Sequence, residues 1–245
     1  MYNSSGTRND GLGAQYHTLI YSILYTESIG NTYVYMPIKN MDHNYDNKDD
    51  YIDRVEDLMN IKNNYLNIGD KSLENIEVVN LNYHQTEAIL EKDLDKYLSS
   101  ESMKKLKDIF WKNKDRNHFK NNKLNIAVHV RRPNSHDTRI MGTDIPNHYY
   151  LNLMNLIRNK YGNLILFHIY SQGDIAQFEC YKNDDVVLHL DEDLCSTFIG
   201  MVAADVMVTS FSSYSYAAAL LSDGEIYYIP FWHPPSKNWM VVVIS

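Results

Sequence analysis

Two adjacent arginines, Arg131 and Arg132, are the residues of this chain whose chemistry is most informative. They follow His129 at the end of the apolar run 124–128. A guanidinium group is planar, stays charged at neutral pH and binds two oxygens of a phosphate at once. In a chain of formal charge −8, the pair predicts a diphosphate site rather than a nucleic-acid surface. The alternative is that two solvated arginines merely end a strand.

A long polar loop follows the arginines and carries two carboxylates, Asp137 and Asp144. Loops of this length inside a compact domain are usually functional. A carboxylate near a bound diphosphate can act as a general base for a hydroxyl group. Asp144 is the candidate for this base, whereas Asp137 is interpreted as an ordinary loop acid.

Hydroxyl groups gather after another apolar run, where Ser210, Ser212 and Ser213 precede an expected helix. The free N–H groups and positive dipole end of a helix start bind anions. Serines are also common N-caps, so this loop alone leaves both interpretations open. Asp174, in the turn after another strand, has the same alternatives of ligand contact and N-cap.

A glycine-rich turn near the amino terminus contains Gly11, Gly13 and Gln15. Glycines allow a ligand to approach the backbone closely. The turn lacks the third glycine of a dinucleotide fingerprint and the Gly-Lys-Ser/Thr of a P-loop. A plain tight turn is therefore the alternative.

No metal is expected in the proposed chemistry. Asp191 and Asp193 could hold a divalent ion, but an acid cluster that follows a strand is interpreted here as solvated turn residues or helix N-cap acids. Cys180 and Cys195 have no partner at zinc spacing, and two cysteines cannot build a disulfide framework. A Gly-x-Ser-x-Gly elbow for a serine hydrolase is also missing.

Alternating strand and helix patterns along the chain predict the elements that hold these residues. In the first half we expect helices at 15–29, 51–62, 85–98 and 100–111, with strands at 32–36 and 76–79. In the second half we expect strands at 124–130, 164–170, 186–190, 205–209 and 225–229, and helices at 147–159, 174–181, 195–203 and 213–222. This order predicts an α/β fold with a parallel, doubly wound sheet.

The length, composition and apolar pattern of the chain indicate its domain organisation and its cellular location. The chain has 245 residues, of which 44% are hydrophobic, enough for a substantial core. A polar connector at 112–123 divides it into an amino-terminal half at 1–120 and a carboxyl-terminal half at 121–230, with a tail at 231–245 that packs back. No apolar run long enough for a membrane span and no signal peptide are found, so we expect a cytoplasmic location.

Three passages together resemble the fucosyltransferases of the α-1,6 and α-1,2 types and the related nodulation enzymes. They are Gly11–His17, similar to a Gly-x-Gly-x-Gln segment, Ala127–Arg132, similar to a His-x-Arg-Arg motif, and Val208–Ser213, similar to a Phe-Ser-Ser segment. The resemblance implies a GT-B-like fold, in which two Rossmann-like halves enclose a cleft. It also implies an inverting glycosyltransferase that transfers fucose from GDP-fucose to a glycan or another hydroxyl acceptor.

The resemblance implies a role for each matching residue. Arg131 would hold the β-phosphate of GDP and stabilise the leaving diphosphate, and Arg132 would support it or touch the α-phosphate and nearby loops. Asp144 stands where α-1,6 members have a carboxylate proposed as base. The remaining donor-binding positions would be His129, Asp191, Ser212, Ser213, Gly11, Gly13, Gln15 and Asp174.

The chain also departs from the family pattern. Asn134 stands where the family often has an acid, and Gly173-Asp174 replaces an Asp-Asp pair. These departures motivate a second interpretation, a non-catalytic module that binds sugar nucleotides or glycans. A nucleotide-binding regulatory α/β protein is a third.

Overall fold

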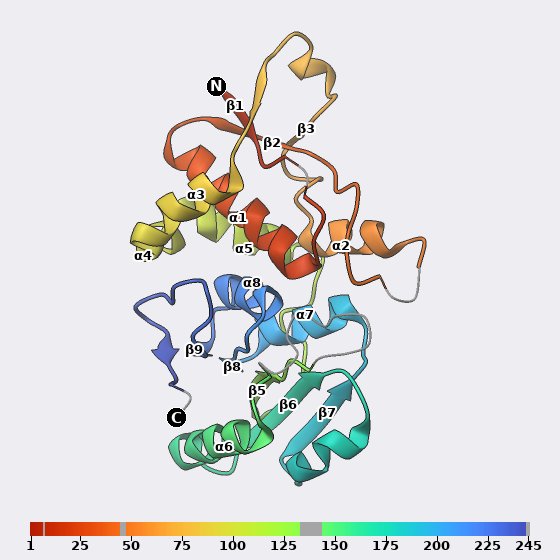
Figure 1. Ribbon diagram of the computed structural model, residues 1–245, viewed down its shortest axis with the longest axis vertical. Coiled ribbons are helices and arrows are strands. Elements are labelled where there is room, and N and C mark those ends of the chain that lie inside the picture. Colours follow the sequence, from red (N-terminus) through yellow and green to blue (C-terminus); the bar gives the residue numbers. More distant parts are fainter. Residues whose placement is uncertain (7, 45–47, 133–143, 244–245) are drawn as a thin grey trace. The chain divides into compact units, whose positions relative to one another are not determined.

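The computed structural model describes all residues except 7, 45–47, 133–143 and 244–245 (Figure 1). It divides into two compact units, unit 1 at Met1–Asp115 and unit 2 at Arg116–Ser245. Each unit is built on a parallel sheet with helices, which confirms the predicted α/β class. The boundary lies within the polar connector identified in the sequence. Asp137 and Asn134 belong to the segment 133–143, which lies outside the described residues.

Unit 1 contains a four-stranded sheet with the order β3-β2-β1-β4. Its strands are β1 (Tyr2–Ser4), β2 (Thr32–Tyr35), β3 (Leu66–Asn67) and β4 (Val78–Asn80). Strand β1 pairs in parallel with both β2 and β4, so it is an interior strand. The sequence analysis missed β1 because three residues that include buried Asn3 and Ser4 give no apolar pattern.

The main helix of unit 1 is α1 (Leu12–Ser28), which is buried over most of its length. It begins three residues earlier than predicted. The predicted helix at 85–98 consists of three pieces instead, α3 (Tyr83–Leu90), the 3₁₀ turn η2 (Glu91–Asp93) and α4 (Leu94–Leu98). The other helical segments are α2 (Tyr51–Met59), η1 (Lys71–Leu73) and α5 (Glu101–Trp111).

Unit 2 contains a six-stranded sheet with the order β10-β9-β8-β5-β6-β7, and its pairings are parallel. Its strands are β5 (Leu124–His129), β6 (Ile165–Ser171), β7 (Val186–Leu190), β8 (Val206–Val208), β9 (Glu225–Tyr228) and β10 (Met240–Val241). Its helices are α6 (Asn147–Tyr161), α7 (Leu194–Ala203) and α8 (Ser213–Leu221). The predicted helix at 174–181 is a 3₁₀ segment, η3 (Ile175–Tyr181).

The two faces of the unit 2 sheet are covered differently. Ile126 and Val128 of β5 pack in one core with Leu153 and Ile157 of α6, and with Phe178 of η3. Helix α7 contacts β5 and packs against α8. Alternation along β5 therefore turns His129 away from the α6 core, and its ring lies 5.6 Å from that of Tyr214 on α8.

The tail at 231–245 adds to unit 2. Strand β10 extends the sheet by pairing with β9, and the Trp239 ring lies 5.7 Å from the ring of Tyr216 and 5.5 Å from that of Tyr228. In the described part of the chain, no helix has the length and apolar character needed to cross a membrane.

Candidate anion-binding site at the carboxyl ends of β5 and β8

The order of strands in unit 2 creates a switch point between β5 and β8. The chain runs from β5 outward to β6 and β7, then returns to the other side of β5 to form β8 and β9. Connections on the two sides of such a point diverge, and ligands of open α/β sheets bind in the crevice at the carboxyl ends of the strands there. The arginine pair follows β5, and the serine segment follows β8. The two strongest sequence motifs thus meet at the position where this fold binds ligands.

Arg131 and Ser212 are in direct contact at the switch point. The Nη1 group of Arg131 donates a hydrogen bond to Oγ of Ser212 over 3.1 Å. Ser212 is the N-cap of α8, and its Oγ accepts from the backbone N–H of Tyr214 at 3.2 Å. A guanidinium group, a hydroxyl and a helix start therefore converge on one point. This combination suits an anion with several oxygens.

Ser213 is the first residue of α8, next to the N-cap. A neighbouring turn orders this helix start. The N–H of Ser210 donates to Oγ of Ser215 at 3.1 Å, and the N–H of Ser212 donates to the carbonyl of Ser210 at 2.8 Å. The two interpretations of the serines, cap and anion cradle, are compatible, because the cap leaves the other first-turn N–H groups directed outward.

His129 lies beside this point as a neutral ring. Its Nδ1 is 2.7 Å from Oγ of Ser210. Burial, followed by the positive charge of Arg131, lowers the pKa of His129 to about 3. At neutral pH the imidazole is therefore a hydrogen-bonding group without charge and does not add to the positive potential of Arg131.

Arg132 has a different environment from its neighbour. Its side chain is buried, and its Nη1 donates to the carbonyl of Ile145 at 2.9 Å. Its Nη2 donates to Oδ1 of Asn147, the first residue of α6. Asp144 Oδ2 lies 3.8 Å from Nη1 of Arg132, and its side chain is 37% exposed. Arg132 thus ties the end of β5 to the start of α6 and holds the candidate base Asp144 next to a fixed positive charge.

Asp191 and Asp174 both bind backbone groups of the turn after β6. The carboxylate of Asp191 accepts from the N–H of Gly173 at 3.2 Å, and Asp191 has a left-handed φ of 53°. Asp174 accepts from the N–H of Ala176 at 2.9 Å and is the N-cap of η3. The cap that the sequence offered as one alternative for Asp174 is therefore present.

A chain of hydrogen bonds that the sequence analysis did not find supports the end of β7. His168 Nδ1 lies 2.9 Å from His189 Nε2, and His189 Nδ1 lies 2.8 Å from Glu192 Oε1. His168 Nε2 lies 3.2 Å from Asn125 Oδ1. Burial, followed by the charges of His189 and His118, lowers the pKa of His168 to about 4. Residues on three separate strands and a turn cooperate here, so spacing along the chain gives no signal for them.

The glycine turn of unit 1 has a packing role of its own. Gly11 is the N-cap of α1, and a Cβ there would lie 2.4 Å from Cδ2 of His43. Gln15 is buried, and its Nε2 donates to the carbonyls of Asp10 and Asn40, each at 2.8 Å. Gly13 is buried within the first turn of α1. Gly11 and Gln15 therefore fix the loop that enters α1.

Comparisons with known proteins give few matches. No family model matches the chain, and no curated protein matches it. Among solved structures, NodZ α-1,6-fucosyltransferase co-crystallized with GDP superposes with a TM-score of 0.44 at 12% identity, covering 90% of this chain and 92% of that chain. The fucosyltransferase NodZ from Bradyrhizobium gives a TM-score of 0.45 at 12% identity, covering 90% of this chain and 93% of that chain.

A heptosyltransferase is also similar. E. coli WaaC with ADP-2-deoxy-2-fluoro heptose gives a TM-score of 0.43 at 14% identity, covering 99% of this chain and 93% of that chain.

Proposed function

We propose that this chain is a glycosyltransferase that moves a sugar from a nucleoside diphosphate to a hydroxyl group, with inversion and without a metal. The contact of Arg131 with the N-cap Ser212 at the β5/β8 switch point is the observation that carries the proposal. It gathers the positive charge and hydrogen-bond donors that a leaving diphosphate requires. Preorganised donors of this kind stabilise charge that develops in the transition state.

The reaction needs a proton acceptor and a site for the departing charge. In the proposed step the acceptor hydroxyl gives its proton to the Asp144 carboxylate as its oxygen bonds to the anomeric carbon. The bond from that carbon to the β-phosphate oxygen breaks, and its electron pair leaves on the diphosphate. Arg131 and the start of α8 receive this negative charge, so the step balances without a metal ion.

Other residues are assigned supporting roles. Arg132 is buried and bonded to the start of α6, which supports a positioning role next to Asp144 rather than direct phosphate contact. Neutral His129 and the carboxylate of Asp191 are assigned to the nucleoside. Ser213, with the N–H groups of the α8 start, is assigned to the diphosphate.

The remaining motif residues keep weaker assignments. Asp174 borders the site as a cap. Gly11, Gly13 and Gln15, at the loop that enters α1, keep their assignment as donor-binding positions. The donor is proposed to be GDP-fucose, on the strength of the three motifs in the sequence, and the acceptor a glycan or another hydroxyl compound.

Binding and turnover measured together test this function. The purified chain is heated with GDP, UDP, ADP and their sugar conjugates, and release of the diphosphate is followed with and without acceptors. A ligand that binds the folded state raises the melting temperature. We expect GDP-fucose to raise it and to be turned over in the presence of EDTA. Arg131→Ala should abolish the shift and the turnover, whereas Arg116→Ala, at an exposed ion pair with Asp223, should change neither.

Each outcome separates the candidate functions. A shift with no release of diphosphate under any condition would favour the binding module. An increase in melting temperature that is the same for a nucleotide with and without its sugar would favour the regulatory nucleotide-binding protein. Full turnover by Arg131→Ala would refute the proposed site.

A further inference from the structure

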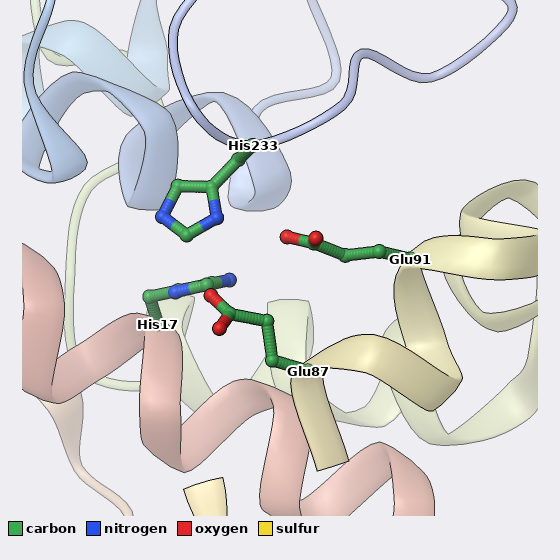
Figure 2. A group of neighbouring side chains, drawn as sticks. All are labelled: His17, Glu87, Glu91 and His233. Carbon is green, nitrogen blue, oxygen red and sulfur yellow. The ribbon is translucent and has the colours of Figure 1, made fainter. Parts of the chain in front are cut away.

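Three potential metal-binding side chains of unit 1 converge where α1 packs against α3. His17 comes from α1, Glu87 from α3, and Glu91 from the turn η2 that continues α3 (Figure 2). One ligand atom of each lies within 4.8 Å of those of the others. Helices α1 and α3 are in direct contact, so this convergence is internal to unit 1.

Helical spacing places the two carboxylates on the same side. Glu87 and Glu91 are four residues apart, and η2 continues directly from α3. Side chains at this spacing are neighbours on a helix surface, and two like charges there destabilise the helix. A cation bound by both removes this repulsion. Both side chains are half-buried, which also reduces the screening of their charges by water.

The ring of His17 is buried and held in one orientation. Its centroid lies 3.9 Å from that of Tyr21, at an interplanar angle of 65°, and 6.1 Å from that of Tyr83. The hydroxyl of Tyr83 donates to Glu87 Oε1 at 2.5 Å and lies 3.4 Å from Nδ1 of His17. Since the hydroxyl proton points to Glu87, the oxygen, which also interacts with Arg8, has a second lone pair that can accept from Nδ1–H. Nε2 then carries the lone pair, as it does in a metal-binding histidine whose other nitrogen donates to an outer partner.

We propose that His17, Glu87 and Glu91 bind one divalent transition-metal ion, best matched by Zn²⁺. An imidazole nitrogen favours this class of ion over Mg²⁺ or Ca²⁺, which prefer oxygen ligands. Zinc binds nitrogen and carboxylate oxygen at about 2.0–2.2 Å, so half-buried glutamates adjust their rotamers to reach it. Two carboxylates and a neutral imidazole balance the two positive charges. Water fills the coordination sites that remain.

The position in the fold gives this ion a structural effect. Helix α1 follows β1 and α3 follows β4, and these two strands are neighbours at the switch point of the unit 1 sheet. An ion bound by both helices links the segment that follows β1 to the segment that follows β4. The inference is independent of the proposed glycosyl transfer, which uses no metal and whose charged groups lie in unit 2.

Zinc titration of the intact chain tests the site. Cys180→Ser and Cys195→Ser are introduced first, because free thiols bind zinc adventitiously. After removal of metal with a chelator, Zn²⁺ is titrated in competition with a chromophoric chelator, with Mg²⁺ and Ca²⁺ as comparison ions. We expect one Zn²⁺ per chain and a higher melting temperature, with no such effect of Mg²⁺ or Ca²⁺.

Matched variants locate the ion. Glu91→Gln and Glu87→Gln keep side-chain size and should each weaken binding by tenfold or more. Tyr83→Phe removes the hydroxyl that bonds both His17 and Glu87, and should weaken zinc binding by about 10–100-fold. Glu77→Gln is the control, an exposed acid in front of β4. Circular dichroism of the metal-free variants checks that each is folded.

Two results would overturn the site. One is a metal-free chain that fails to compete for Zn²⁺ at micromolar concentration. The other is stoichiometric binding that Glu91→Gln and Glu77→Gln affect to the same degree, since the ion then lies elsewhere. Co²⁺ substitution adds a spectroscopic check, because nitrogen and oxygen ligands give d–d bands without a thiolate charge-transfer band.

Discussion

Arg131 and Arg132 are adjacent, yet the end of β5 turns their side chains to different surroundings. Arg131 contacts the cap of α8, where a ligand oxygen can share its guanidinium group. Arg132 is buried, and its donors are used by the carbonyl of Ile145 and the amide of Asn147. The proposed function therefore assigns Arg131 to donor binding, whereas the contacts of Arg132 hold the framework together.

Alanine at each position should separate the two roles. Arg132→Ala leaves buried acceptors without donors, and we expect a loss of about 2–4 kcal/mol of unfolding free energy. Arg131→Ala removes a half-buried side chain and should cost below about 1 kcal/mol while abolishing donor binding. Urea unfolding of both variants measures the difference. Equal losses of stability would contradict the division.

Buried histidines link the stability of unit 2 to pH. The pKa is lowered to about 3 for His129 and about 4 for His168, whereas an unperturbed imidazole titrates near pH 6.5. As pH falls through 6.5, the unfolded chain takes up protons that the folded chain does not bind. The stability gained by keeping these rings neutral is therefore full above pH 6.5 and is lost progressively toward pH 4.

Replacing a buried histidine should reduce this dependence on pH. Each such ring contributes a slope of about 1.4 kcal/mol per pH unit below 6.5. We expect His168→Gln to flatten the fall in urea stability between pH 6.5 and 4.5, although it lowers stability at pH 7.5. The exposed His148→Gln is the control. If His168→Gln leaves the slope of unfolding free energy against pH unchanged, groups other than His168 cause the loss of stability at low pH.

At the scale of elements, close contact between α7 and the sheet depends on one small residue. Gly200 lies in the middle of α7, and a Cβ there would be 2.1 Å from Oη and 2.8 Å from Cζ of Tyr170. Tyr170 is buried in β6 and stacks on His189, with centroids 4.6 Å apart. The ring therefore has little room to yield, and the helix itself would have to move.

Gly200→Ala should destabilise the chain despite the better helix propensity of alanine. Overpacking of this kind costs about 1–3 kcal/mol, which exceeds the gain of about 1 kcal/mol from propensity. Tyr170→Phe in the same chain removes the closest atom and should recover part of the loss. A double-mutant cycle in urea measures this coupling. Additive effects would mean that the helix shifts freely.

At the scale of the whole molecule, the chain forms two units that each contain a parallel sheet with its own switch point. Around the boundary between Asp115 and Arg116, basic side chains are exposed at Lys112, Arg116 and Lys120. Protease cleavage concentrates in exposed segments that make few contacts with the folded units.

Limited trypsin digestion should therefore cut first within 112–123. We expect two fragments that correspond to the two units. Each fragment should be degraded more slowly than the segment 112–123 is cut. Mass spectrometry of a time course identifies the first site. A first cut inside α1 or α6 would contradict the assignment of compact units.

The sequence by itself determined the order of strands and helices in the second half and the motifs at two strand ends. Periodicity is a local property, and strands β5 and β6 carry long runs of buried residues that display it. Short elements whose pairing supplies their stability, such as β1 and β10, gave no such signal. Their backbone hydrogen bonds depend on partners far along the chain.

Only the tertiary structure decided which side chains meet. It brought Arg131 to Ser212, turned Arg132 inward, and joined His168, His189 and Glu192. It also placed His17 beside two glutamates that follow it by some seventy residues. Parallel sheets connect residues that are distant in sequence through crossovers, so spacing along the chain cannot report these contacts.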